Sequence, residues 1–196
     1  MGDEAMSTET GALQSLVQDS LRESWEAFKQ DAVLYVLANL VVIALGMISL
    51  GVLFAPLTVG MIGIVRKRRR GEPARVGDVF DGFSSFGASF VAGMIVVLGV
   101  ILGAILLVVP GVVFAFLSLF TFHGIAYRQL GAVDAIKHSF AAVKGHALAV
   151  FVFLLVAFVI NAIGGLVWIG GLLTGPFTTV LLTVAYEKLS ADLPPA

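Results

Sequence analysis

Three long stretches of the chain contain no Asp, Glu, Lys or Arg: residues 32–65, 82–127 and 145–186. They are 34, 46 and 42 residues long. A helix that crosses a bilayer needs about 20 apolar residues, so each stretch is about long enough for two crossings. Because backbone polar groups must find partners within the chain when they lie in hydrocarbon, these stretches are predicted to be helical.

Each stretch is interrupted by proline or glycine, at residues 51–56, 110–111 and 170–176. Proline is tolerated in the first turn of a helix, where its missing N–H leaves no hydrogen bond unmade. The pattern therefore predicts a helical hairpin in each stretch, with the second helix starting near the proline. The expected fold class is an all-α polytopic membrane protein with about six transmembrane helices in three hairpins.

The first hairpin is short in its second arm. Only ten residues separate Pro56 from Arg66, which is about 15 Å of helix. A hydrocarbon core is about 30 Å thick, so a re-entrant first hairpin remains an alternative to a full crossing.

The composition agrees with a membrane protein. Apolar residues make up 59% of the chain and charged residues 13%, whereas soluble domains have about 45–50% and about 25%. The mean hydropathy is +1.02. Cysteine is absent, which excludes disulfides, thiolate metal sites and cysteine nucleophiles.

All twelve Lys and Arg residues lie outside the three stretches. Cytoplasmic loops of membrane proteins carry an excess of these residues. The distribution therefore predicts that both termini and both loops between the hairpins lie in the cytoplasm.

An apolar triplet with offsets 0, 4 and 7 precedes or enters each stretch. The triplets are Leu21, Trp25 and Phe28; Val76, Phe80 and Phe83; and Ile136, Phe140 and Val143. Such offsets line one face of a helix, which predicts an interfacial amphipathic helix before each hairpin. The residues expected to anchor these helices are Trp25, Phe28, Phe80, Phe83 and Phe140.

The triplets also suggest a threefold internal repeat, with units at about 13–70, 74–129 and 131–189. These units form one membrane domain, 13–190, between a disordered polar segment, 1–12, and a tail, 191–196. Chance matching of triplets in an apolar chain is the alternative to a true repeat.

The strongest local charge feature follows the first stretch. It consists of Arg66, Lys67, Arg68, Arg69, Arg70 and Arg75. A stop-transfer anchor is the simple interpretation, and contact with anionic lipid headgroups is the functional one. Nucleic acid is not an expected partner, because no aromatic residue interrupts the run and Asp78 and Asp81 follow it.

Three polar residues within the stretches are candidates for a structural or functional role. Asn39, His123 and Asn161 are expected either to hydrogen-bond neighbouring helices or to line a pathway. Gly99 and Gly103 have the GxxxG spacing, which allows close helix packing within the chain or between copies.

No constellation for catalysis or metal binding stands out, so neither enzymatic activity nor a metal or cofactor is expected. The three histidines are not accompanied by cysteine or by acidic residues at metal-ligand spacing within the membrane stretches. The one conceivable catalytic cluster, for chemistry on lipid headgroups, is His138, His146 and Asp134 on the cytoplasmic side.

One sequence pattern resembles a known family. Pro110-Gly111 is followed by Ala135, Ser139 and Gly145 in an Ala-x-x-x-Ser-x-x-x-x-x-Gly segment. This pairing is similar to the membrane domain associated with bacterial glycerophosphodiester phosphodiesterases and to related six-helix bacterial membrane proteins. The resemblance implies a membrane module in a bacterial inner (plasma) membrane, without the soluble catalytic domain and with no active residue carried across.

Together these features predict a non-enzymatic scaffold or accessory subunit of a membrane assembly. Its expected partners are membrane lipids, anionic in particular, and other membrane proteins or further copies of this chain. The alternative function is a transporter or channel for a small or lipid-like solute.

Overall fold

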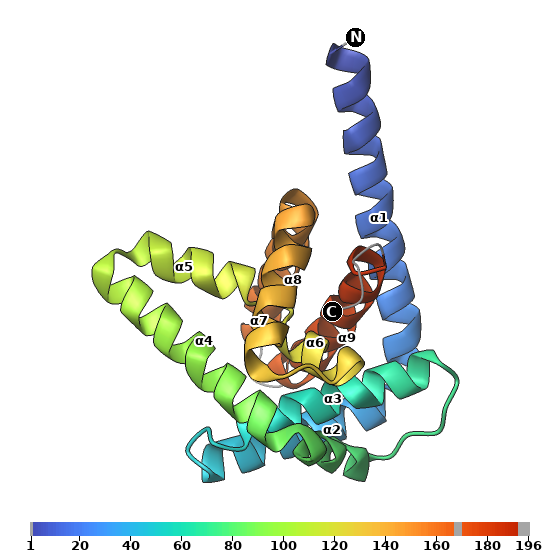
Figure 1. The fold of residues 1–196 in the computed structure, drawn as a ribbon. Helices are drawn as coiled ribbons and strands as arrows, with labels where there is room; N and C mark the ends of the chain where they lie inside the picture. Colours follow the sequence, from blue (N-terminus) through green and yellow to red (C-terminus); the bar gives the residue numbers. More distant parts are fainter. Residues whose placement is uncertain (1, 167–169, 192–196) are drawn as a thin grey trace.

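The computed structural model describes residues 2–166 and 170–191, and this part of the chain is helical with no strand (Figure 1). The elements are α1 (Gly2–Gln30), α2 (Ala32–Ile48), α3 (Phe54–Arg69), the 3₁₀-helix η1 (Val76–Ser85), α4 (Phe86–Leu106), α5 (Val108–Leu117), α6 (Thr121–Arg128), α7 (Ala132–Gly145), α8 (Ala147–Gly165) and α9 (Gly170–Leu189). The all-α prediction is confirmed for these residues.

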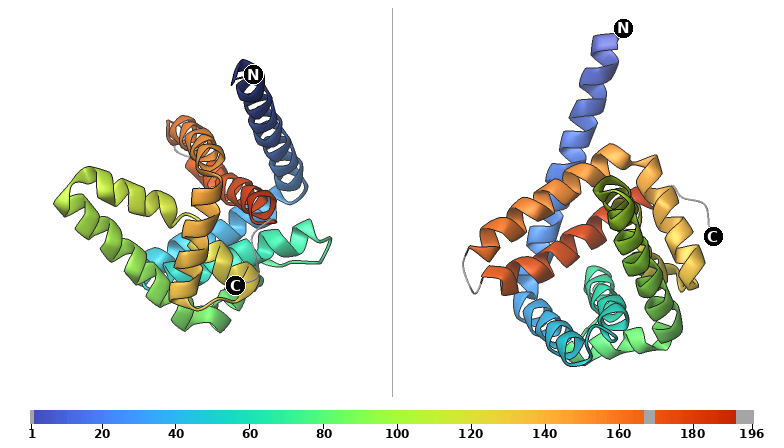
Figure 2. Two further views of the ribbon diagram at one scale, coloured as in Figure 1. Left: turned by 45° about the horizontal axis from the view of Figure 1, so that its top comes forward. Right: turned by 90° about the vertical axis from the view of Figure 1, so that its left-hand side faces the viewer.

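Consecutive long helices pack against each other in three places: α2 on α3, α4 on α5, and α8 on α9. The α4–α5 pair projects away from the rest of the chain (Figures 1 and 2). Large apolar side chains are exposed where these pairs turn, with Leu50 94%, Leu107 71% and Leu166 85% exposed. Exposure of such side chains at the turns suits hydrocarbon far better than water.

Helices α3 and α9 form the centre of the molecule. Most residues of α3 between Ala55 and Val65 are buried. Helix α9 contributes Val180 and Val184 to one core cluster and Leu181 to another. Helix α3 contacts α2, η1, α4 and α6, and α9 contacts α1, α2 and α8. Because α3 and α9 also contact each other, they join these parts of the fold.

The prolines mark helix starts in two of the three pairs. Pro56 is the third residue of α3 and Pro110 the third residue of α5, as expected for a first turn. Pro176 differs, because it is the seventh residue of α9, which already begins at Gly170. The prediction that the last helix starts near its proline was wrong, because the glycine-rich segment before it is itself helical.

Three segments of the structure are long and apolar enough to cross a membrane: Val76–Leu106, Val108–Arg128 and Ala147–Gly165. A fourth is possible if Thr10–Gln30 and Ala32–Ile48, which are bent by 89°, count as one broken span. Helices α3 and α9 are not among them. Helix α3 is short, with 16 residues of which the last four are basic. Helix α9 has 20 residues but includes three glycines, four threonines and a proline, which lower its hydropathy.

The segments expected to be interfacial are built in three ways. Helix α1 begins at Gly2 and includes residues 2–12, which belong to the segment for which disorder was expected, and it packs against α9 and α8. The second segment, η1, is a 3₁₀-helix. The third is the α-helix α7.

Two glycines explain why η1 lies so close to α3. A Cβ atom on Gly60 of α3 would stand 1.8 Å from the carbonyl oxygen of Val79, and one on Gly82 would stand 1.9 Å from that of Pro56. The two backbones are therefore in direct contact. No other residue fits at either position without displacing a helix.

Candidate functional site

The basic segment, which is residues Arg66 to Arg70, ends α3 and sends its side chains to different helices. Arg68 Nε and Nη2 donate to the two carboxylate oxygens of Asp31, at 2.7 and 2.8 Å. Arg69 Nε donates to Glu187 of α9 at 2.6 Å, and its Nη2 to Glu23 of α1 at 3.4 Å. These pairs join the start of α2, the C-terminal part of α1 and the end of α9 to α3.

Two further members of the basic segment are also engaged. Lys67 Nζ donates to Asp81 at 2.8 Å and to Asp78 at 3.1 Å, both on η1. Arg66 Nη1 donates to the Ala126 carbonyl of α6 at 2.9 Å. The Arg66 guanidinium also lies 4.7 Å from the centroid of the Tyr127 ring.

The acidic partners raise the pKa of Lys67. Hydrogen bonds to Asp81 and then Asp78, with the charges of the same two carboxylates, raise the pKa of Lys67 above its ordinary 10.5. Burial opposes this effect but is outweighed. Lys67 is therefore a firmly charged group at neutral pH.

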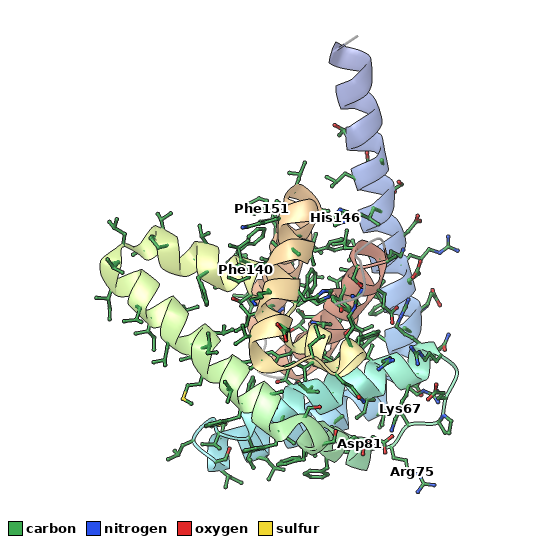
Figure 3. All side chains as sticks on the ribbon, viewed as in Figure 1. Lys67, Arg75, Asp81, Phe140, His146 and Phe151 are labelled. Carbon is green, nitrogen blue, oxygen red and sulfur yellow. The ribbon has the colours of Figure 1, made fainter. Side chains whose placement is uncertain are left out.

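The structure thus gives the basic segment an internal role that the sequence did not indicate. Four of its five residues bind partners within the chain, while Arg70 and Arg75 are exposed. In Figure 3, Arg75 extends away from the molecule beyond Asp81. Of the six residues expected to contact lipid headgroups, these two have side chains that are exposed and outside the ion pairs.

Two hollows lie on the side of α3 that faces α4 and α6. The polar cavity has a volume of about 310 Å³ and lies between the basic segment, η1 and α6. The apolar groove has a volume of about 510 Å³ and lies between the α2–α3 turn, α4 and Phe122 of α6. A third hollow of about 450 Å³, lined by charged residues of α1 and by Asp31, Arg68 and Arg69, lies on another side.

The five expected anchoring residues separate into exposed and packed side chains. Trp25 and Phe80 are 52% and 48% exposed and remain available to a membrane interface. Phe28 is 6% exposed and stands in the core with α2, α3 and α9, so its assignment as an anchor was wrong. Phe83 is half-buried against the same cluster. Phe140, labelled in Figure 3, packs edge-on against Phe114 of α5 with ring centroids 5.6 Å apart.

The polar residues expected inside the membrane all meet the central helix α9, at different positions. Asn161 Nδ2 donates to Thr178 Oγ1 at 2.6 Å, and also to the Ala157 carbonyl one turn back in α8. His123 Nε2 lies 3.4 Å from Thr183 Oγ1. Asn39 faces Gly175, where an added Cβ would lie 3.3 Å from its Nδ2.

The GxxxG pair packs α4 against α5 within one chain. A Cβ on Gly99 would stand 2.4 Å from the Phe114 ring, and one on Gly103 would stand 2.7 Å from the Gly111 backbone. The close approach belongs to the α4–α5 pair itself.

Ser139 of α7 belongs to the pattern that suggested a family resemblance. Its hydroxyl bonds to backbone groups at the junction between α5 and α6. Its Oγ donates to the Leu117 carbonyl at 2.6 Å and accepts from the Phe120 N–H at 3.0 Å. These groups lie where α5 ends and α6 begins. No local sequence pattern indicated that the helix is interrupted between Leu117 and Thr121.

The conceivable catalytic cluster is not joined by contacts. His138 Nε2 lies 2.9 Å from the Tyr186 hydroxyl, and Asp134 lies 3.9 Å from Lys137. His146 stands at the junction of α7 and α8 (Figure 3). Within the described part of the chain, no hydrogen bond or ion pair links the three, and no group of three His, Asp or Glu residues could hold a metal ion.

The fold defines an all-helical protein with several helices that are long and apolar enough to cross a membrane. Residues 6–191 match the family described as a domain of unknown function, DUF7847, and the chain belongs to this family. No curated protein and no solved structure matches the chain.

Proposed function

We propose that this protein is a non-enzymatic scaffold or accessory subunit of a membrane assembly. The supporting observation is the projecting α4–α5 pair, whose two helices pack on each other through glycines and leave apolar outer faces uncovered. Leu102, Ile105 and Val112 on these faces are 59%, 75% and 62% exposed. Helices in lipid associate by close packing, and a projecting pair presents two faces to neighbouring helices.

The proposed placement is a multi-pass arrangement in the plasma membrane, with six crossings in three hairpins and both termini in the cytoplasm. It is supported by the exposed apolar turns of the three helix pairs. It is also supported by the basic residues, none of which lies near those turns. Under this proposal α3 and α9 cross the membrane inside the protein, where surrounding helices cover them.

Site-specific photo-crosslinking in intact membranes tests the scaffold proposal. A photoreactive residue at Leu102 or Val112 should give discrete protein adducts, because these faces would contact a partner helix or a second copy. The same residue in place of Leu148, which is 65% exposed on α8, serves as the matched control for random collision. If Leu102 and Val112 gave only lipid adducts, or no more protein adducts than Leu148, the scaffold proposal would be wrong.

A transporter or channel for a small or lipid-like solute is the second candidate. One observation favours it: His123 is buried, and its Nδ1 has no hydrogen-bond partner in the described structure. Ionisable residues within a membrane often mark a pathway. Proton flux into vesicles that contain the purified protein should then fall in His123→Leu, whereas under the scaffold proposal wild type and variant leak equally.

A further inference from the structure

The polar cavity and the apolar groove lie one after the other along α3. Both are lined by the same three parts of the chain, in matching order. Helix α3 gives Ala55 to the groove and Arg66 to the cavity, while α6 gives Phe122 to the groove and Ala126 to the cavity. The η1–α4 segment completes both, with Ser85 in the cavity and residues from Phe90 onward in the groove.

The spacing of the two hollows corresponds to one leaflet of a bilayer. Eleven residues of helix separate Ala55 from Arg66, a rise of about 16 Å at 1.5 Å per residue. Half of a hydrocarbon core of about 30 Å is about 15 Å. A phospholipid with its headgroup at Arg66 would therefore have its acyl chains at the depth of the groove.

The polar cavity offers donors that the chain itself leaves unused. Arg66 Nε is buried without a hydrogen-bond partner, and Arg70 is exposed with no ion-pair partner in the described part of the chain. Lys67 is different, because Asp78 and Asp81 already neutralise it. Apart from these pairs, the charged groups that line the cavity are the two guanidinium groups and the carboxylate of Glu72. Two guanidinium groups at one site favour phosphate, whose oxygens accept paired N–H donors.

The apolar groove carries no charged side chain. Phe54, Met94 and Val97, three of its lining residues, are 51%, 47% and 56% exposed along its walls. Gly93 leaves the floor open between Ala55 and Phe122, since an added Cβ would lie 3.2 and 3.6 Å from them. An apolar groove of this kind, continuing from a phosphate site at leaflet spacing, fits an acyl chain.

We propose that this face of α3 binds one membrane phospholipid, with its phosphate at Arg66 and Arg70 in the polar cavity and an acyl chain in the apolar groove. The inference depends on the basic segment lying at a membrane surface but not on the scaffold role. It places the α2–α3 turn, which lines the groove, near the middle of the bilayer, as in the re-entrant form of the first hairpin. The bound lipid belongs to the leaflet that faces the basic segment.

Native mass spectrometry of the full-length protein in detergent, titrated with a diacyl phosphatidylglycerol, tests the proposal. Arg70→Gln should weaken binding about fivefold, since one basic residue near a lipid surface contributes about that factor. Val97→Trp should reduce binding by filling the groove. The matched controls are Arg75→Gln, an exposed arginine outside the cavity, and Val91→Trp, an exposed valine of α4 outside the groove.

Each outcome of the titration decides one part of the proposal. Equal losses of binding in Arg70→Gln and Arg75→Gln would mean that the lipid is attracted by charge in general and not by this cavity. Unchanged binding in Val97→Trp would mean that no acyl chain occupies the groove. Either result overturns the proposal. Glycerol phosphate, which has no acyl chain, serves as a competitor. If it displaced the lipid at equal concentration, the site would be one for free phosphate esters. The scaffold proposal is decided separately, by crosslinks at Leu102 and Val112.

Discussion

Lys67 shows how one residue of the basic segment differs from its neighbours. Its ammonium group lies between two carboxylates of η1, which fix the position of η1 on α3. Exposed ion pairs usually contribute little to stability, but this one comes with direct backbone contact at Gly60 and Gly82. The ion pairs of Lys67 and the two glycines therefore both stabilise the contact between α3 and η1.

The raised pKa of Lys67 leads to a prediction about alkaline pH. A group whose pKa is higher in the folded state stabilises that state fully below its unfolded value, here 10.5, and loses this effect as the pH rises through the folded value. Thermal unfolding in detergent should therefore move to lower temperature above pH 10.5. Lys67→Arg, which keeps its charge there, should show a smaller decrease. Parallel pH profiles for the two proteins would contradict this role of Lys67.

The contact at Gly60 leads to a prediction about packing. Gly60→Ala should lower the free energy of unfolding by about 1–3 kcal/mol, the usual cost of overpacking, because its Cβ would overlap the Val79 carbonyl. Gly63→Ala is the matched control, three residues along α3, where nothing lies within 4 Å of an added Cβ. It should be neutral or slightly stabilising, because alanine favours helix over glycine. Thermal melts followed by circular dichroism would show the difference, and equal effects would contradict the close η1–α3 contact.

At the scale of elements, the features that depend on local sequence patterns were predicted. The contacts between residues far apart in the sequence were not. Helix content, the first two turns and the amphipathic segments follow from hydropathy and proline position. The ion pairs Arg68–Asp31 and Arg69–Glu187 join residues 37 and 118 positions apart. No local pattern indicates such pairing, so the basic run resembled an isolated anchor. Likewise, the break between α5 and α6 depends on Ser139, which comes from a later helix.

The junction between α5 and α6 can be tested through that serine. Ser139→Ala would leave the Leu117 carbonyl and the Phe120 N–H without their partner. Leaving buried polar groups unpaired costs about 1–3 kcal/mol. Hydrogen exchange should rise at the Phe120 amide more than in the middle of α8. Ser15→Ala, which removes an exposed hydroxyl bonded to its own helix, is the control. Unchanged exchange at Phe120 would show that the serine does not hold the junction.

At the scale of the whole molecule, the division between charged and apolar regions was foreseen, while the number of crossings was not settled. Three segments, or four with the bent pair, reach the length and hydropathy of a span. Helices α3 and α9 lie outside these segments, although many of their residues are covered by other parts of the chain. Hydropathy measures what a helix would present to lipid. It therefore understates a helix such as α9 when that helix crosses a membrane inside a bundle, whereas α3, with 16 residues, is also short for a span.

The proposed placement predicts which side of the membrane each turn faces. The chain has no cysteine, so single cysteines at Val52, Val109 and Gly171 can be labelled without background. The first two are 44% and 70% exposed, and an added Cβ at the third meets nothing within 4 Å.

A membrane-impermeant thiol reagent added to intact cells should label all three, because they lie at the ends of the pairs remote from the basic segment. A cysteine at Arg75 should react only after the cells are opened. If Val52 alone stayed unlabelled both before and after the cells were opened, α2 and α3 would be re-entrant, since their turn would then lie within the membrane. That depth is the one the lipid inference gives to this turn. If all three behaved like Arg75, the charged and apolar ends of the molecule would not lie on opposite sides of a bilayer, and the six-crossing arrangement would be wrong.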